Sequence, residues 1–359
     1  MELTHTEQSL LDLIEQPAFL VQNGRIVRCN SEANKRNITC ATSLSNILAD
    51  DAYNAFTGEQ TLLPLNVDGI SCRAVVRRLD NWDLFLLEPD NTQTQLQSLA
   101  LAAQHLRSPL GGIMAIADIL LANEVLRQDS AALSQTIQLN RSLNQLQRMI
   151  CDMSDVWQYA NQQNIHKQVV DVRLLFQEIL EKASAILTNS NVTIHFKGLT
   201  QPVFSVVDTQ MIERAIYNLL SNAVKYSKSP CVIEAKLSLK GSTLHFSVIN
   251  ETTPGSNPTA ASVFSRFMRQ PGLEDSSFGM GLGMMLVRSV ASAHEGSVYV
   301  DNPSKKKRRV TMTLQVKESA DGDISSPIIR ITDYAGGRDH ALMELSDVLP
   351  SYLYDNQKY

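Results

Sequence analysis

Apolar residues recur at helical spacing through residues 91–165. One stripe has steps of three and four residues and comprises Leu96, Leu99, Ala103, Leu106, Leu110, Ile113, Ala117 and Leu120. A second stripe comprises Leu143, Leu146, Ile150, Met153 and Trp157. This spacing predicts two amphipathic helices, and Asp129 and Ser130 between them favour the start of the second. We expect an antiparallel helical hairpin that pairs with a second copy as a four-helix bundle in a homodimer. Packing of the hairpin against its own chain is the alternative.

Residues 166–317 alternate between helical and strand-like patterns. Asp171 is well placed to cap a helix, and a strongly periodic helix is expected over 211–226. Strand patterns fall at 192–196, 231–237, 244–249, 297–301 and 310–316. Another helix is expected over 281–293. Together these elements predict an α/β sandwich with helices on one face of a mixed sheet.

Residues 1–90 predict a small mixed α/β domain. An apolar run at 17–21 and a second at 26–30 flank Asn23 and Gly24, which is a strong hairpin signal. Further strands are expected at 70–77 and 82–87. The tail, 318–359, begins with a linker-like run, shows a strand pattern at 328–331 and a helical pattern at 341–348, and receives no function. The chain is therefore expected to be a multidomain α+β protein divided at 1–90, 91–165, 166–317 and 318–359.

Composition excludes little but narrows the setting. A net charge of −5 gives no overall field for nucleic acid. The basic cluster at 305–309 lies between two expected strands and is read as a solvated hairpin tip. The five cysteines are scattered without a CxxC pair, and no uninterrupted apolar run approaches the roughly 18 residues of a membrane helix. We expect a cytoplasmic protein with no membrane span and no nucleic-acid partner.

Glycines precede the helix expected over 281–293. Gly279, Gly281 and Gly283 fall within five residues, with Leu282 between the last two. Glycines let a ligand approach the backbone, and the start of a helix offers free N–H groups and a positive dipole end to phosphate. Taken alone, the pattern also fits a plain turn at a helix entry.

A polar stripe on the helix at 211–226 adds to this evidence. Asn218, Asn222 and Lys225 are spaced at i, i+4 and i+7, so they share one face. An amide oxygen suits Mg²⁺ that is held mainly by phosphates, and a lysine adds a point charge. A solvated polar face is the alternative interpretation.

These segments carry a family resemblance. Residues 218–227 resemble the asparagine box of sensor histidine kinases, and 279–283 resemble their GxGLG box. Residues 263–269 between them are similar to the phenylalanine box of the nucleotide lid, and residues 1–90 more distantly resemble a PAS sensor domain. The resemblance implies a Bergerat-type ATP site with ATP and Mg²⁺ as cofactors.

The resemblance also implies roles for individual residues. Asn222 would be the Mg²⁺ ligand, with Asn218 and Lys225 near the phosphates. The remaining candidates for nucleotide binding are Tyr226, Asn250, Gly279, Gly281, Leu282 and Gly283. Packing is the alternative for Tyr226.

Two departures from the family pattern concern the chemistry. Asn250 stands at the end of a strand where the family has an aspartate for the adenine amino group, and Thr252 and Pro254 replace glycines. An amide still accepts a hydrogen bond but loses charge assistance worth about 1 kcal/mol. Nucleotide affinity or specificity is expected to change accordingly.

The second departure is in the phosphoacceptor box. When Arg107, Ser108 and Pro109 are aligned with the family pattern, Gln104 takes the place of the histidine. His105 is then the candidate acceptor, but it is rotated about 100° around the helix, and a structural role for it is the alternative.

Two functions follow from these observations. The first is a cytosolic sensor histidine kinase-like protein that binds Mg-ATP, takes part in a two-component phosphorelay and acts on a response regulator or partner kinase. The second is a signalling pseudokinase that binds nucleotide without phosphoryl transfer. A plain ATPase lacks a candidate general base near Asn218.

Overall fold

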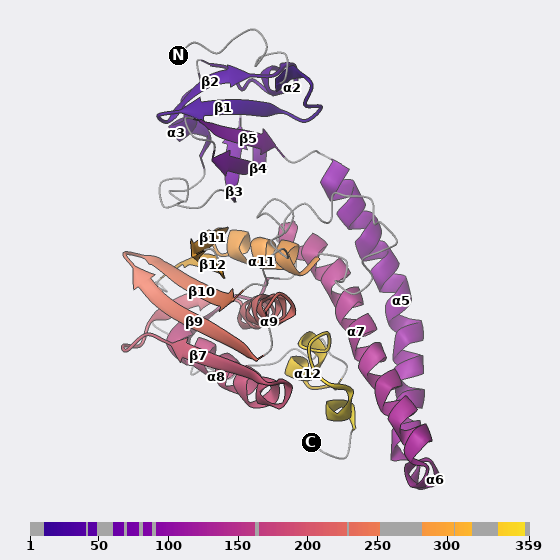
Figure 1. Cartoon of the computed structure of the whole chain (residues 1–359). Coiled ribbons are helices and arrows are strands. Elements are labelled where there is room, and N and C mark those ends of the chain that lie inside the picture. The colour runs from indigo at the N-terminus through magenta and orange to yellow at the C-terminus, as the bar shows by residue number, and fades with distance from the viewer. Residues whose placement is uncertain are drawn as a thin grey trace.

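The computed structural model describes residues 11–40, 42–48, 60–67, 70–78, 82–87, 91–161, 165–227, 230–251, 282–304, 306–317 and 337–355. The described part forms an N-terminal strand-rich region, a pair of long helices and a sheet covered by helices (Figure 1). The last described segment packs between the sheet's helices and the long pair (Figure 1).

The two predicted long helices are present. Helix α5 spans Asn91–Ala122 and helix α7 spans Ser130–Ala160, and they pack along one another (Figure 1). Asp129 caps α7 as expected, because its side chain accepts from the N–H groups of Ala131 and Ala132. A short helix that the sequence pattern did not predict, α6 (Glu124–Gln128), is capped by Asn123 and joins the two.

The apolar stripe on α5 differs from the expected one. The α5 residues that are buried are Leu96, Ala103, Leu110, Met114, Ala117 and Leu121. Leu106 and Ile113, which were expected to share the buried stripe, are 49% and 50% exposed. A single partner helix covers only one side of α5, so its second apolar line remains at the surface together with Ile116 and Ile119.

Helix α5 bears on the expectation that the chain has no membrane span. Over Leu96–Ala122 it is long and apolar enough to cross a membrane by length and composition alone, in a search confined to the described residues. Of its most apolar window, 22% is buried. A single helix of this kind is compatible with a membrane span and equally with a helix whose second apolar face pairs with another protein.

The central sheet has the predicted strands and mixed character. Its strands are β7 (Val192–Lys197), β9 (Cys231–Lys240), β10 (Thr243–Glu251), β11 (Val298–Ser304) and β12 (Lys307–Gln315). Strands β7 and β9 are parallel, whereas β9, β10, β12 and β11 pair antiparallel in that spatial order. Two short strands, β6 (Gln168–Asp171) and β8 (Phe204–Val207), form a separate antiparallel pair that the sequence pattern did not predict.

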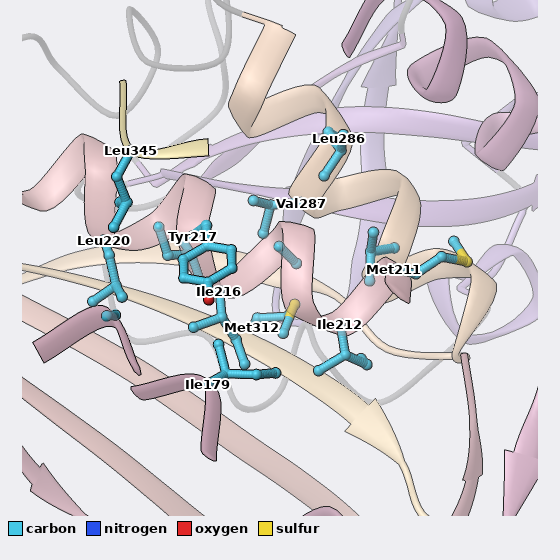
Figure 2. Packing of buried hydrophobic residues seen from close by; sticks show 14 of the residues in the cluster. Ile179, Met211, Ile212, Ile216, Tyr217, Leu220, Leu286, Val287, Met312 and Leu345 are labelled. Carbon is cyan, nitrogen blue, oxygen red and sulfur yellow. The ribbon is translucent and has the colours of Figure 1, made fainter. Parts of the chain in front are cut away.

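Helices α8 (Val172–Leu187), α9 (Thr209–Lys225) and α11 (Leu282–Ala293) supply the helical layer. The predicted cap is confirmed for α8, because Asp171 accepts from the Arg173 N–H at 3.0 Å. A 3-10 turn, η1 (Thr188–Ser190), follows it. Figure 2 shows Ile179 of α8, Ile212 and Ile216 of α9 and Met312 of β12 gathered in one core. The helix layer therefore holds α9 and α11 firmly against the sheet.

The N-terminal region has its own core. It contains β1 (Ala18–Gln22), β2 (Arg25–Cys29), α2 (Ser31–Lys35), α3 (Leu44–Ile47), β3 (Gln60–Val67), β4 (Ile70–Arg78) and β5 (Asp83–Leu87). The predicted hairpin is present, with Asn23 and Gly24 both at positive φ. Strand β3, which was not predicted, pairs with β11 at Leu62 and Val298, so the two regions form one ten-stranded sheet.

The end of the chain is part of the main core. Helix α12 (His340–Glu344) packs against α7, α8 and α9 (Figure 1). The 3-10 helix η4 (Ser351–Tyr354) packs against α7. Leu345 points toward α9, beside Tyr217 and Leu220 (Figure 2). The helical pattern at 341–348 is thus partly realised, and the strand pattern at 328–331 lies outside the described residues.

Candidate functional site

Asn218 is the first residue of the polar stripe on α9 and is 1% exposed. Its Nδ2 donates to the carbonyl of Arg214 at 3.0 Å, and its Oδ1 accepts from Arg148 Nη2 at 2.9 Å. Arg148 comes from α7 and also donates to Ser221 Oγ at 3.2 Å. The Asn218 amide is therefore held in one orientation, and the half-buried Asn222 and Lys225 follow it along the same face.

The start of α11 meets this stripe at a glycine. A Cβ added to Gly283 would lie 2.4 Å from Asn218 Oδ1, which no side chain tolerates. Leu282 beside it is buried. The structure thus brings two of the predicted segments together at Gly283 and Asn218. Gly279, Gly281 and the segments at 252–255 and 263–269 lie outside the described residues.

Asn250 is the penultimate residue of strand β10 and lies beside the C-terminal end of α9. It is 4% exposed, and its Nδ2 donates to Ser227 Oγ at 3.0 Å. Ser227 Oγ donates in turn to the carbonyl of Ala223 on α9. Tyr226, which directly precedes Ser227, is the half-buried C-cap residue of α9. The polar end of the strand and the polar end of the helix are thus linked directly.

A carboxylate from the end of the chain contacts the cations of the stripe. Asp347 Oδ2 lies 2.5 Å from Lys225 Nζ and 2.9 Å from Arg148 Nη1. Burial alone would raise the pKa of Asp347, but Arg148 and Lys225 outweigh it and the net shift is downward. Burial lowers the pKa of Lys225, and Asp347 opposes that shift. Asp347 is therefore a carboxylate held by two cations.

Beneath the stripe lies a buried ionic network. Arg214 is fully buried and contacts Asp152 at 2.6 Å, Glu344 at 2.8 Å and the carboxylate of Asp155. Burial raises the pKa of Asp152 to about 6, although Arg214 pulls in the opposite direction. Arg148, Arg214 and Asp347 fall outside the motifs that predict the site. Of the three, Arg214 is the one that the sequence places near the stripe, because it lies one helical turn before Asn218 on α9.

The donors on this face suit a phosphorylated ligand. Lysine and arginine bind phosphate, and Asn222 offers an amide oxygen. No group of three or more histidine, cysteine, aspartate or glutamate residues that could hold a metal occurs among the residues described. A divalent cation at Asn222 therefore needs phosphate oxygens as its other ligands, and Mg²⁺ is commonly held in this way.

Gln104 and His105 lie on the exposed side of α5. Because His105 is exposed, its burial gives no support to the alternative that it packs in the interior. It is Arg148 of α7, and not His105 of α5, that contacts the Asn218 amide.

Part of this chain is similar to known proteins. Residues 207–318 match the family described as histidine kinase-, DNA gyrase B- and HSP90-like ATPase. The chain is 28% identical over 282 residues to the adaptive-response sensory kinase SasA of Synechocystis sp., covering 75% of this chain and 73% of that protein. It is 28% identical over 202 residues to the sensor protein RstB of Escherichia coli K12, covering 55% of this chain and 44% of RstB. Among solved structures, full-length ShkA in complex with AMPPNP matches with a TM-score of 0.48 and 20% identity, covering 62% of this chain and 47% of ShkA.

The matched range contains α9, β9, β10, α11, β11 and β12. Residues 207–318 therefore form a domain that matches the histidine kinase-, DNA gyrase B- and HSP90-like ATPase family. Its relatives are sensor histidine kinases, so the predicted resemblance to that family is confirmed. The chain spans less than half of RstB.

Proposed function

We propose that this chain binds Mg-ATP between the polar face of α9 and the start of α11, as a histidine kinase-like protein of two-component signalling. The observation that carries the proposal is the contact of Gly283 with Asn218, which unites two family motifs inside the matched range. The second support is the pair of cations, Lys225 and Arg148, that already binds an anionic group there.

Each candidate residue is assigned to one part of the bound Mg-ATP. Asn222 would hold Mg²⁺, Lys225 would face the phosphates with the buried Asn218 beneath them, and Asn250 would contact adenine. The backbone at Leu282 and Gly283 would follow the phosphates on the other side, and Gly279 and Gly281 stay predicted nucleotide-binding residues. When bound, Mg²⁺ would neutralise charge on the β- and γ-phosphates.

His105 is the phosphoacceptor in this proposal. Its imidazole is exposed on α5 and is a usable nucleophile, whereas the Gln104 amide is not. The second apolar line on α5 supports a homodimer in which two helical hairpins form a four-helix bundle. The proposed setting is cytoplasmic, the partner is a response regulator or another kinase, and the domain limits at 90, 165 and 317 belong to the same proposal.

Incubation of the full chain with γ-labelled ATP and Mg²⁺ tests the kinase activity. Acid-labile, alkali-stable label that is present in the wild type and in Gln104→Ala, but lost in His105→Ala, is the expected result. The Gln104→Ala variant is the matched control, since it changes the neighbouring exposed residue.

A pseudokinase is the second candidate. Gln104 at the acceptor position and the altered box that contains Asn250 favour it, because both depart from the family pattern for phosphoryl transfer. Nucleotide binding without any label on the protein would select this candidate. Absence of nucleotide binding would contradict both.

A further inference from the structure

The segment 337–355 lies beside the candidate site and is held there by contacts with residues that are distant in sequence. These join Arg127 to Asp355, Asn140 to Tyr354, Arg141 to Ser346, Glu213 to His340, and Arg214 to Glu344. Leu345, Leu349 and Leu353 are buried in the same core as α9. This segment, called the C-terminal strap below, is thus a packed part of the molecule.

Two carboxylates of the strap differ in depth. The Glu344 side chain has no exposed surface and contacts the buried Arg214. The Asp347 side chain is 28% exposed and lies on the edge of the candidate site. Asp347 can therefore leave its partners without extraction of the buried anchor at Glu344.

The partners of Asp347 are the groups that would bind phosphate. Lys225 belongs to the polar stripe of α9, and Arg148 holds the Asn218 amide of the same stripe. A carboxylate and a phosphate compete for the same lysine and arginine donors, because both are anions with several acceptor oxygens.

We propose that Asp347 is an internal occupant of the phosphate subsite, so that the C-terminal strap keeps the site in a low-affinity state until nucleotide displaces this carboxylate. The inference rests on the proposed function and adds a regulatory element to the same site. A ligand shifts such an equilibrium only by its differential affinity for the two states. Nucleotide and Asp347 are therefore expected to weaken one another's hold on Lys225 and Arg148 equally.

The test compares the full chain with Asp347→Asn, which keeps the shape of the side chain and removes its charge. The readout is the Kd of Mg-AMP-PNP by isothermal titration. A partly buried ion pair of this kind predicts binding about three- to tenfold tighter in Asp347→Asn. The control is Glu295→Gln, which removes one charge from an exposed pair with Lys317 and should leave the Kd unchanged.

The melting temperature without nucleotide separates regulation from a purely structural role. Asp347→Asn is expected to melt at or below the wild-type temperature while it binds nucleotide more tightly. A strap that only supports the fold would give weaker or unchanged binding in the same variant, and that result would overturn the inference.

Hydrogen exchange supplies the second readout. The amides of Leu345, Val348 and Leu349 donate within the strap. Saturating Mg-AMP-PNP is expected to speed their exchange in the wild type. Equal affinity in both proteins with unchanged exchange sinks the inference and leaves the proposed function standing. Failure of wild type, Asp347→Asn and Glu295→Gln to bind nucleotide at all would instead overturn the proposed function, and the inference with it.

Discussion

Gly283 occupies a position where only a hydrogen fits on the Cα. The Oδ1 atom of Asn218 would lie 2.4 Å from an added Cβ, and Asn218 is itself fixed by Arg148 and the Arg214 carbonyl. Neither partner can retreat without breaking a buried hydrogen bond. Close approach to Asn218 therefore requires glycine at this position, independent of any ligand.

Gly283→Ala is expected to destabilise the protein by about 1–3 kcal/mol and to weaken nucleotide binding, because the Asn218 amide must move. Urea unfolding and a nucleotide titration measure the two effects. Gly111→Ala is the matched control, since its Cβ would meet nothing within 4 Å on helix α5. That control is expected to stabilise by about 0.5–1 kcal/mol, because alanine replaces glycine inside a helix. Equal effects of the two variants would contradict this account.

His294 is held in its neutral form by two backbone groups. Its Nε2 accepts from the Asp208 N–H at 3.0 Å, and its Nδ1–H donates to the Val290 carbonyl at 2.8 Å. Burial lowers the pKa of His294 below its ordinary value of 6.5; the Val290 hydrogen bond opposes this shift and Lys167 adds to it. The unfolded chain therefore binds the proton at a pH where the folded chain does not.

Stability is expected to fall as pH drops below about 6.5, with a slope of at most ~1.4 kcal/mol per pH unit from this group. The loss is complete below the folded pKa. Urea unfolding of wild type and His294→Gln between pH 7.5 and 5 measures it. A slope that stays the same in His294→Gln would show that His294 is not the source.

Most elements of residues 166–317 were predicted well because they carry strong local information. Strand alternation marks β9 and β10, and Asp171 caps α8. Strands β6 and β8 were missed because four residues are too few to show a period. On α5, spacing alone did not show which of two apolar lines faces α7.

The exposed apolar line on α5 predicts a dimer. Ile113→Glu places a charge within it, so dissociation to a monomer is expected, measured by light scattering on a gel-filtration column. Leu13→Glu is the control, since it adds the same charge to an exposed leucine in the N-terminal region. A wild-type monomer, or dissociation of both variants, would contradict the four-helix bundle.

At the scale of the whole molecule, contacts between distant residues organise the site. The Arg148–Asn218 bond joins residues 70 positions apart, and the Lys225–Asp347 bond joins residues 122 apart. Periodicity and motif spacing describe neighbours in sequence and do not reveal pairs this far apart. The Asn218 stripe was predictable because its residues share one helix, whereas its polar partners and the docking of the C-terminal strap were not.

Glu344 ties the strap to α7 and α9 through buried charges. Glu344→Gln removes one of the three carboxylates around Arg214, which Asp152 and Asp155 still contact. It is expected to cost about 1–3 kcal/mol in the free energy of unfolding, because a buried charge-assisted hydrogen bond is lost. Chemical denaturation measures the loss. Glu295→Gln, at an exposed pair, is expected to change stability by less than about 0.5 kcal/mol. Equal losses would show that the buried network contributes no more than the surface pair.

A titration of the full chain with AMP-PNP, with and without Mg²⁺ and in parallel with Asn222→Ala, tests the central claim most directly. Saturable binding of one nucleotide per chain is expected. Omission of Mg²⁺ or the Asn222→Ala change should each weaken it at least about tenfold, or ~1.4 kcal/mol. Absence of binding at millimolar nucleotide, or binding that neither change affects, would contradict a magnesium-nucleotide site on this face of α9.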